Sequence, residues 1–432
     1  MNANQVQGFG LNMLSRFAQS DWPDRLRVRK PFEKLLYTGS KNGFRLVGVA
    51  ARQFGKGGAK LDGKQRLPAA SKGLFDLSLT EEQQMMRETL QRFARELVRP
   101  AAHGADHDAR FPAELRAQAL ELGLNFYAVP EALGGMAAEQ SVVTNVLMAE
   151  DLGHGDFTLG AALLAPMGVA NALTRWGTKE QQEKYLPAFA EETPPLAAIA
   201  VNEGKALFNP FALATRATRD GAGYLLNGEK TLVLLGASAE LLLVAAELDG
   251  KPAVFIVEGG REGLAFMEDP GMGLKAAETV KLRLDNVRAE KLGESDFDYS
   301  AFLDHAALAW CALAIGTCQA VLDYVIPYCN DRVAFGEPIS HRQSVAFMIA
   351  DMAIEIDAMR LLVWRAAARA EAGMPFHREA YLARLLCSEK SMKIGTDGVQ
   401  LLGGHGFTKE HPVERWYRDL RALAVMQGGL HA

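Results

Sequence analysis

The sequence predicts an α+β protein that is mostly helical, with a small β-domain between two helical regions. Three observations predict this order: capping-box signals within residues 75–192, hairpin signals within residues 193–296, and helical periodicity that returns after residue 297. We therefore expect an N-terminal extension and linker at 1–74, a helical domain at 75–192, a β-domain at 193–296 and a helical region at 297–432.

The N-terminal extension differs in charge from the rest of the chain. Residues 1–72 contain 14 Lys and Arg against 4 Asp and Glu, a charge of +10, whereas the whole chain carries −5. Such a tail could contact anionic lipid, nucleic acid or an acidic partner surface, or lie solvated against its own acidic body. Of these contacts, we carry forward a peripheral membrane contact through residues 1–72, without nucleic acid.

The bulk composition is that of a protein with several buried cores. At 432 residues and 49% hydrophobic content, the chain has no apolar run approaching the roughly 20 residues of a membrane span, and no secretory signal near Met1. We expect a cytoplasmic protein. Its four cysteines lack CxxC spacing, so we predict reduced core residues with neither a disulfide nor a metal site: Cys311, Cys318, Cys329 and Cys387.

The helical domain at 75–192 has two clear helix starts. Thr80 and Thr178 each precede a glutamine by three residues, Gln83 and Gln181, which is the spacing of a capping box. After the first box, apolar side chains recur at intervals of four, three and four and predict one buried face, made of Met86, Leu90, Phe93 and Leu97.

The next region changes to short β-type runs. Hairpin signals stand at Asp220-Gly221 and Asn227-Gly228, followed by the apolar runs LLLVAAEL at 241–248 and AVFIVE at 253–258. Long helical segments return around 300–330, 341–371 and 376–402, which is typical of a helix bundle. The predicted order is therefore helices, strands and helices.

Six segments together resemble the acyl-CoA dehydrogenase family across essentially all of residues 76–429. They are VPEALGG at 129–135, MAEDLGHGD at 148–156, GTKEQQEKYLPAFAEE at 177–192, GYLLNGEK at 223–230, the segment at 320–353 that contains RVAFGEP, and the closing segment at 401–421 that begins LLGGHG. LLGGHG alone would be a weak glycine-loop signal, but this many segments in order are specific.

The resemblance implies a helical domain, a β-domain and a four-helix bundle, assembled as a dimer of dimers with FAD at a subunit interface. In the family a carboxylate takes the α-proton of an acyl thioester while the β-hydrogen leaves as hydride to the flavin. An active member would pass electrons to an electron-transfer flavoprotein. Fold alone does not establish this function.

Residues that match the family's adenine-binding half are well represented. The resemblance implies that they hold the pyrophosphate and adenine of the neighbouring subunit's FAD: Arg332, Phe335, Gln343, and the turn of Gly403, Gly404, His405 and Gly406. A guanidinium can pair with phosphate oxygens, and a glycine turn lets backbone amides approach them. Alternatively, Arg332 only pairs with Asp331 or another nearby carboxylate, and the glycines only permit a tight turn between helices.

The half that would hold the flavin ring departs from the family. Asn202 could still bond the pyrimidine edge of the flavin. Phe208 stands where the family has a serine that faces cofactor and CoA, Leu232 and Leu234 replace the Trp and Thr of a Trp-Ile-Thr segment, and Gly429 replaces a closing-turn threonine. Replacing a hydroxyl by leucine leaves a bound polar atom unpaired, at a cost of about 1–3 kcal/mol.

Neither of the two family positions for the catalytic base holds a base. Gln427 occupies the first and Ala306 the second, and neither an amide nor a methyl group accepts a proton at ordinary pH. His305, one residue from the second position, is a weak substitute candidate because its unperturbed pKa is near neutral. We interpret Asp304 as a surface or interface charge and Glu203 as an architectural residue near the cofactor.

Three functional hypotheses remain. We favour a catalytically degenerate subunit that completes the FAD site of a catalytic partner in fatty-acyl or related acyl thioester oxidation. The second is an active FAD-dependent acyl-CoA dehydrogenase with a non-standard base such as His305. The third is a non-enzymatic binding or scaffold protein whose old pocket is filled by Phe208, Leu232 and Leu234. The chain could assemble with itself or with a different partner, and acyl-CoA binding stays open.

Overall fold

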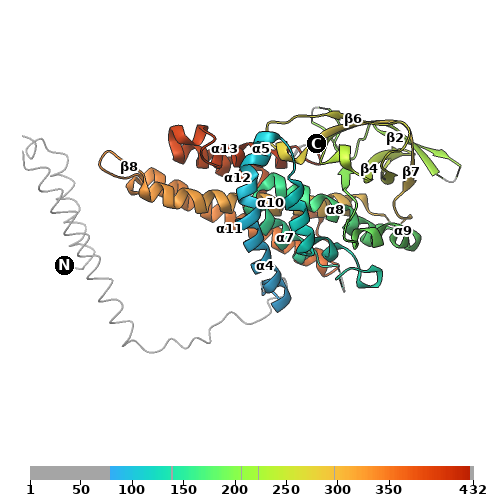
Figure 1. The fold of residues 1–432 in the computed structure, drawn as a ribbon, viewed down its shortest axis with the longest axis horizontal. Coiled ribbons are helices and arrows are strands. Elements are labelled where there is room, and N and C mark those ends of the chain that lie inside the picture. Colours follow the sequence, from blue (N-terminus) through green and yellow to red (C-terminus); the bar gives the residue numbers. More distant parts are fainter. Residues whose placement is uncertain (1–77, 138–139, 206, 222, 296, 429–432) are drawn as a thin grey trace, which may run out of the picture. The chain divides into compact units, whose positions relative to one another are not determined.

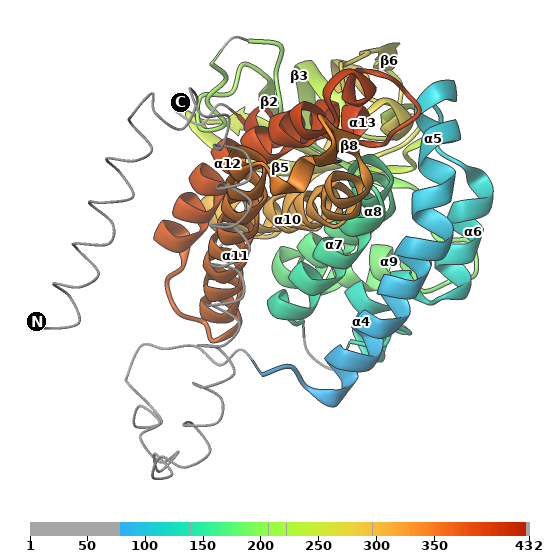
Figure 2. The same cartoon turned by 90° about the vertical axis from the view of Figure 1, so that its left-hand side faces the viewer.

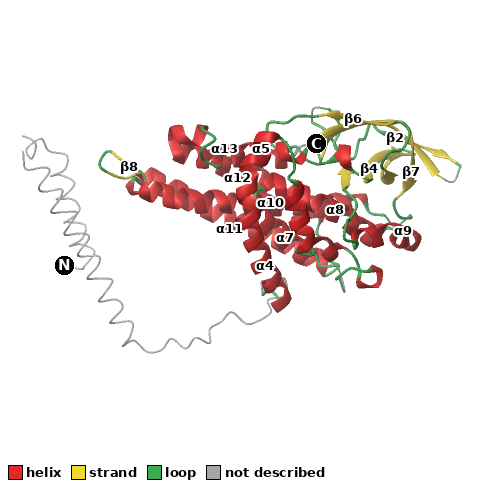
Figure 3. Cartoon of the chain, viewed as in Figure 1, coloured by secondary structure: helices red, strands yellow, loops and turns green. Residues whose placement is uncertain are grey.

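The computed structural model describes residues 78–137, 140–205, 207–221, 223–295 and 297–428. These residues belong to one compact unit that spans Phe75–Ala432. The predicted basic extension and Gly429 lie outside the described residues. Within them, the order of helices, strands and helices is confirmed, and the strands of the middle region gather in one part of the unit (Figures 1 and 3).

The first helical region contains six α-helices and a π-turn. They are α4 (Glu81–Phe93), η1 (Ala94–Val98, the π-turn), α5 (Arg99–Asp108), α6 (Ala113–Glu121), α7 (Val142–Gly155), α8 (Phe157–Trp176) and α9 (Lys179–Phe189), with short 3₁₀ turns η2 (Leu124–Ala128) and η3 (Glu131–Leu133). Both predicted capping boxes are present, since the hydroxyls of Thr80 and Thr178 accept from the backbone N–H of the glutamine three residues on.

One member of the predicted buried face is wrong. Met86, Leu90 and Phe93 are buried, but Leu97 is 39% exposed and Val98 is buried in its place. The cause is the π-turn η1, because an i→i+5 turn holds one residue more than an α-turn and moves the following residues around the helix axis.

The β-domain is a single sheet that closes on itself. Its strands are β1 (Ala197–Ala200), β2 (Arg216–Asp220), β3 (Gly223–Val233), β4 (Leu241–Leu248), β5 (Lys251–Glu258), β6 (Leu264–Glu268) and β7 (Val280–Lys291), with short turns η4 (Gly236–Ser238) and η5 (Lys275–Ala277). The order is β1-β4-β2-β3-β7-β5, β6 pairs with β7, and β5 also pairs with β4. The inward side chains of this closed sheet form a core of their own.

The predicted hairpin at Asn227-Gly228 is wrong. Asp220-Gly221 does lie where β2 turns into β3, but Gly228 lies inside β3 at a register shift against β7. Its φ is +150°, and a Cβ there would lie 2.7 Å from Thr215 Cα. The glycine therefore permits a bulge and a close backbone approach rather than a turn.

The C-terminal region is built from long helices and a small hairpin. Its elements are α10 (Tyr299–Asp331), β8 (Val333–Ala334), β9 (Glu337–Pro338), η6 (Ile339–His341), α11 (Gln343–Glu371), α12 (His377–Leu402), η7 (Gly403–Phe407), α13 (Val413–Leu420) and η8 (Arg421–Ala424). Helix α10 is central and packs against α7, α11 and α12 (Figure 2). Hairpin β8–β9 lies at the end of α10 and α11 away from the β-domain (Figure 1).

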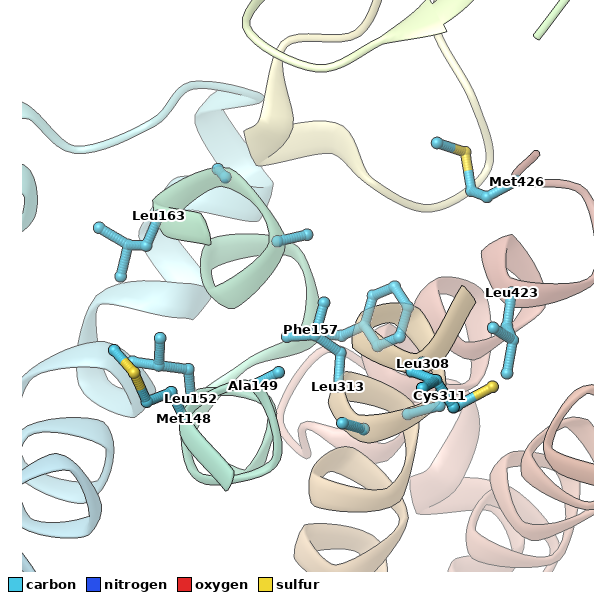
Figure 4. Close-up of a cluster of buried hydrophobic side chains, with 14 of the residues drawn as sticks. Met148, Ala149, Leu152, Phe157, Leu163, Leu308, Cys311, Leu313, Leu423 and Met426 are labelled. Atoms are coloured by element: carbon cyan, nitrogen blue, oxygen red, sulfur yellow. The ribbon is translucent and has the colours of Figure 1, made fainter. Parts of the chain in front are cut away.

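Glycines let α7 and α10 pack closely. A Cβ on Gly316 would lie 1.9 Å from the Glu150 carbonyl oxygen, and one on Gly153 would lie 2.3 Å from the Leu313 carbonyl oxygen. The two backbones thus meet directly, and side chains of α7, α8, α10 and the closing segment form a common core around Phe157, Leu308 and Leu313 (Figure 4). All four cysteines are free and buried.

Two helices are more apolar than the sequence analysis allowed. By length and composition, α8 and α10 could each cross a membrane, with mean hydropathy of 1.4 and 1.5. However, 67% and 72% of their most apolar windows are buried inside the protein. Their apolar character is therefore accounted for by the core that they form with α7 and the bundle.

Candidate active site and cofactor-facing pocket

An inner cavity of about 120 Å³ lies between α8, β1, β3, α10 and the closing segment after η8. Its lining is mostly aliphatic, with one indole from Trp310, and it includes five positions singled out from the sequence: Asn202, Leu232, Leu234, Ala306 and Gln427. The fold thus brings together segments more than 200 residues apart. None of the described residues that line this cavity is an acid or a histidine.

The two family base positions face the same cavity. Gln427 is 7% exposed and has a φ of +61°, and Ala306 lies on α10. At the two positions that the resemblance assigns to the base, the cavity is therefore lined by a carboxamide and a methyl group. The cavity can enclose an apolar group, but its lining contributes no general base.

The polar groups of the inner cavity bond mainly to the protein itself. Asn202 Nδ2 donates to the Val425 carbonyl at 3.0 Å, and its Oδ1 accepts from the Gln427 backbone N–H at 2.6 Å. The Thr231 hydroxyl donates to Asp269, which also accepts from the Leu232 N–H at 2.9 Å. The inner cavity therefore offers few of the hydrogen bonds that the polar edge of a flavin ring requires, and the residues present fit such a ring poorly.

The segment around Phe208 packs against the closing turn. Phe208 is 6% exposed, and a Cβ on Gly428, whose φ is +102°, would lie 2.9 Å from the Phe208 carbonyl oxygen and 2.6 Å from Pro210. Tyr299 on α10 donates to the Pro210 carbonyl at 3.0 Å. The phenyl ring thus belongs to the core, in agreement with its apolar character in the sequence.

Arg384 on α12 fixes the closing turn from the other side. Its guanidinium donates to the carbonyls of Met426 at 2.8 Å and Gly428 at 2.5 Å. The sequence analysis did not identify Arg384 or Tyr299. Each acts across more than 40 residues of chain, and neither lies in a motif, so no local signal marks them.

His305 lies beside the inner cavity and not in its lining. It lines an adjoining cavity and packs its ring against Trp176 and Phe376, with centroids 5.8 Å and 5.0 Å away. Burial and the charge of Arg175 lower the pKa of His305 to about 3. At neutral pH the imidazole is uncharged and a weak base, so this position does not favour His305 as the substitute base.

The two other candidate carboxylates are also engaged in local contacts. Asp304 is buried, and its Oδ2 lies 2.8 Å from His377 Nδ1; burial raises the pKa of Asp304. Glu203 accepts from the amides of Ala214 and Thr215 and from Lys230 Nζ at 2.8 Å. Burial acts to raise the pKa of Glu203, but Lys230 and the two amides hold it below the ordinary value. Asp304 is thus buried within the chain and is not a surface charge, whereas a place at a subunit interface stays a prediction.

An outer pocket of about 570 Å³ opens where the end of α10 meets the β8–β9 hairpin, α11 and η7. The residues that line it include five that the family resemblance predicts, Arg332, Phe335, Gly403, Gly404 and His405, together with Tyr328 and Arg342. Two guanidiniums beside a glycine turn suit a phosphate group. Arg342 was not predicted from the sequence as a site residue, although it directly precedes the predicted Gln343 in the same segment.

The guanidinium of Arg332 has no ion pair among the residues that the structure describes, which disfavours a simple pairing with Asp331. Arg342 lies over the Phe335 ring at 5.1 Å and 3.8 Å from Glu337. Phe335 itself is 94% exposed with a φ of +57°. The pocket thus presents cationic and aromatic groups to solvent.

Two predicted members of this site are placed elsewhere. Gln343 begins α11 but does not line the pocket. Gly406 is buried, and a Cβ there would lie 2.2 Å from the Val399 carbonyl oxygen, so it permits η7 to pack on α12. Gly403, with a φ of +59°, and Gly404 face open space instead. The first three residues of the turn, Gly403, Gly404 and His405, therefore line the pocket, and Gly406 does not.

Comparison with known proteins gives one consistent result. Three family models match, described as the N-terminal, middle and C-terminal domains of acyl-CoA dehydrogenase, over residues 80–193, 198–287 and 299–430. A probable acyl-CoA dehydrogenase YngJ of Bacillus subtilis is 32% identical over 368 residues, covering 82% of this chain and 96% of the relative. A probable acyl-CoA dehydrogenase fadE25 of Mycobacterium leprae is 35% identical, covering 82% and 94%.

Solved structures agree. The butyryl-CoA dehydrogenase from Megasphaera elsdenii has a TM-score of 0.76 and 29% identity, and covers 83% of this chain and 97% of its own. A glutaryl-coenzyme A dehydrogenase in complex with glutaryl-CoA has a TM-score of 0.76 and 28% identity, and covers 83% and 94%. The similarity extends over the whole described unit.

Proposed function

Because this chain belongs to the acyl-CoA dehydrogenase family, we propose that it is a catalytically degenerate subunit which completes the FAD site of a catalytic partner in acyl thioester oxidation. One observation carries the proposal. The inner cavity has no acid or histidine among its described lining residues, whereas the outer pocket keeps Arg332 and Arg342 open to solvent.

The chemistry of the family explains why the inner cavity would not catalyse. Dehydrogenation requires a base at the α-proton, and loss of a positioned base costs roughly 10²–10⁴ in rate. Gln427 cannot supply it, and Asn202 and Thr231 are bonded within the chain. A hydrophobic cavity without a base can hold a ligand but cannot move its proton.

The outer pocket retains what a dinucleotide would need. Arg332 and Arg342 would pair with the pyrophosphate of the partner's FAD, and the backbone at Gly403 and Gly404 allows a close approach. Apolar side chains of Ile339, Val345 and Met348 would lie against the adenine. The bound FAD would supply the hydride acceptor in the partner's site, whose electrons an electron-transfer flavoprotein would then take.

A second surface feature supports assembly. Helix α11 exposes Phe347, Ile354 and Leu361, at 58%, 64% and 48%, at a spacing of seven residues, and Val333 in the neighbouring hairpin is 58% exposed. Seven residues are two helical turns, so these side chains form one stripe. An apolar stripe of this kind is typical of an obligate subunit interface. A cytoplasmic location, with membrane contact through residues 1–72, is part of the same proposal.

The test is the flavin content of the chain alone and with a partner. We expect a colourless protein alone, and, after co-expression with a catalytic acyl-CoA dehydrogenase from the same organism, a complex with one FAD per two chains. A flavin-loaded oligomer of this chain alone that bleaches with an acyl thioester would overturn the proposal. Absence of flavin from both preparations would favour the non-enzymatic alternative.

A further inference from the structure

Two histidines at the outer pocket stack on each other. His405 in η7 lines the pocket, and His411 lies between η7 and α13. Their ring centroids are 5.6 Å apart, and the ring planes meet at 25°. Two positive charges at this separation repel each other, so protonation of one imidazole opposes protonation of the other. The pair therefore takes up one proton more readily than two.

Each of these imidazoles contacts a tyrosine of α10. Tyr328 Oη lies 3.0 Å from His405 Nδ1, and Tyr324 Oη lies 2.7 Å from His411 Nδ1. The Tyr328 hydroxyl is also 3.4 Å from the Leu402 carbonyl oxygen. A hydroxyl can both donate and accept a hydrogen bond. Tyr328 can therefore donate to a neutral His405, or accept from a protonated His405 and donate to Leu402 instead.

The two tyrosines differ in this second acceptor. Tyr324 has no acceptor other than His411 among the residues that the structure describes. Burial raises the pKa of Tyr324, so its hydroxyl stays protonated and acts as a donor. It thus favours a neutral His411, whereas Tyr328 accommodates both charge states of His405. The imidazole that lines the pocket is therefore the better proton acceptor of the pair.

The charge on the pocket side of His405 is positive. Arg332, at the end of α10, and Arg342, before α11, line the outer pocket, and none of its described lining residues is an acid. Two guanidiniums disfavour a third positive charge beside them. A bound phosphate group reverses this effect, because it brings negative charge to the same surface. By linkage, anion binding and protonation of His405 should each favour the other.

The other charged groups near the pair lie outside the lining of the pocket. Glu337 is 3.6 Å from His341 and 3.8 Å from Arg342. On the remaining elements that border η7 they are Asp397 and Glu414, which pair with Lys393 and Arg418, and the exposed Asp331, Lys409 and Glu410. None of these lines the outer pocket. His341 is therefore the neighbouring histidine that an experiment has to separate from His405.

We propose that His405 makes anion binding in the outer pocket pH-dependent, because it takes up one proton when a pyrophosphate diester binds beside Arg332 and Arg342. Histidine is the side chain that changes charge in the neutral range. This inference rests on the proposed cofactor role of the outer pocket. It adds that the pocket holds its dinucleotide more tightly as the pH falls, so that FAD retention by the mixed assembly decreases as the pH rises.

The experiment is calorimetric titration of the full-length chain with ADP-ribose at about pH 6 and about pH 8, at constant ionic strength. ADP-ribose contains the adenine and pyrophosphate of FAD, and its pyrophosphate diester has the same charge at both pH values. We expect the affinity to be about tenfold higher at the lower pH, as one further charge-assisted hydrogen bond predicts. Titration in two buffers of different ionisation enthalpy measures proton uptake, which should reach at most about one proton per bound anion.

Three variants assign the proton to a residue. His405→Gln keeps a hydrogen-bonding side chain that cannot be protonated, so it should abolish the proton uptake and the difference in affinity between the two pH values. His341→Gln is the matched control, because His341 is exposed and lies outside the lining of the pocket, and it should keep both effects. His411→Phe keeps an aromatic ring against His405 without a titratable group, and it should also keep both effects.

The outcomes distinguish this inference from the proposed function. Equal affinity at the two pH values, a pH effect that survives in His405→Gln, or its loss in His411→Phe would overturn the inference. So would the absence of ADP-ribose binding at both pH values. FAD retention by the mixed assembly reports separately on the proposed function. Retention that does not change with pH would leave the proposed function standing and remove only the role of His405.

Discussion

The inner cavity and the outer pocket of this chain differ in the groups that they present to a ligand. The inner cavity is lined mostly by aliphatic groups together with Gln427, which is 7% exposed; Phe208, which is 6% exposed, is buried outside that lining. The outer pocket is open, and its Phe335 is 94% exposed beside two arginines. Asn202 and Thr231 of the inner cavity bond within the chain, whereas the exposed Arg332 guanidinium of the outer pocket has no ion pair among the described residues.

This difference bears on the proposal that the chain is a catalytically degenerate subunit. General loss of selection would be expected to affect both regions, including the guanidiniums at the surface, which do little for folding. Instead, Asn202, Arg384 and Tyr299 bond the closing turn and its neighbouring segment, so the inner region is stable without a ligand. The exposed guanidiniums of the outer pocket gain a function only when a ligand binds to them.

The largest expected effect compares two phenylalanines. Phe208→Ala should lower the free energy of unfolding by about 3–5 kcal/mol, because it leaves a cavity in the core. Phe335→Ala should change it by less than about 0.5 kcal/mol, because the ring is exposed. Urea unfolding followed by circular dichroism measures both. Similar losses of unfolding free energy in the two variants would contradict the contrast between a closed inner region and an open outer one.

The outer pocket can be tested through its cations. Arg332→Gln in the mixed assembly should weaken FAD retention by about 10- to 100-fold, since a charge-assisted hydrogen bond contributes about 1.5–3 kcal/mol. Retention is read from flavin absorbance after gel filtration. Arg283→Gln, an exposed arginine on β7, is the control and should retain FAD fully. If both variants retained FAD equally, Arg332 would not be a residue that binds the cofactor.

A structural feature of this protein could be predicted from the sequence where the residues that form it lie close together in the chain. The capping boxes at Thr80 and Thr178 were predicted because all their partners lie within three residues. Leu97 and Asn227-Gly228 were not, because a π-turn and a bulge change the register without a clear sequence mark. In the site, the resemblance located Gln427 and Ala306. The contacts of Arg384 with the closing turn depend on how distant segments pack, so no pattern along the chain could reveal them.

The partly buried histidine beside the inner cavity, His305, predicts a pH dependence. His305 has a pKa of about 3 in the folded chain, below the ordinary value near 6.5, so the unfolded chain binds more protons between these values. Stability should therefore fall as the pH falls from 6.5 towards 3, at up to about 1.4 kcal/mol per pH unit. Between pH 6.5 and 5 this amounts to about 2 kcal/mol. His305→Asn should flatten that part of the urea-unfolding profile, and a parallel profile would show that the imidazole is not buried.

The smallest effect comes from restoring the missing carboxylate. Gln427→Glu places an acid in the apolar inner cavity, where burial should raise its pKa by at least about one unit. The folded chain then binds more protons than the unfolded chain within that window, so stability should fall by about 1.4 kcal/mol as the pH rises from 4 to 7. Gln343→Glu, at an exposed position of α11, should show no such loss.

We also expect no acyl-dependent bleaching from Gln427→Glu, because Asn202 and Thr231 still bond within the chain. Recovery of bleaching by this single change would mean that only the base had been lost, and that the rest of the inner cavity still fits a flavin.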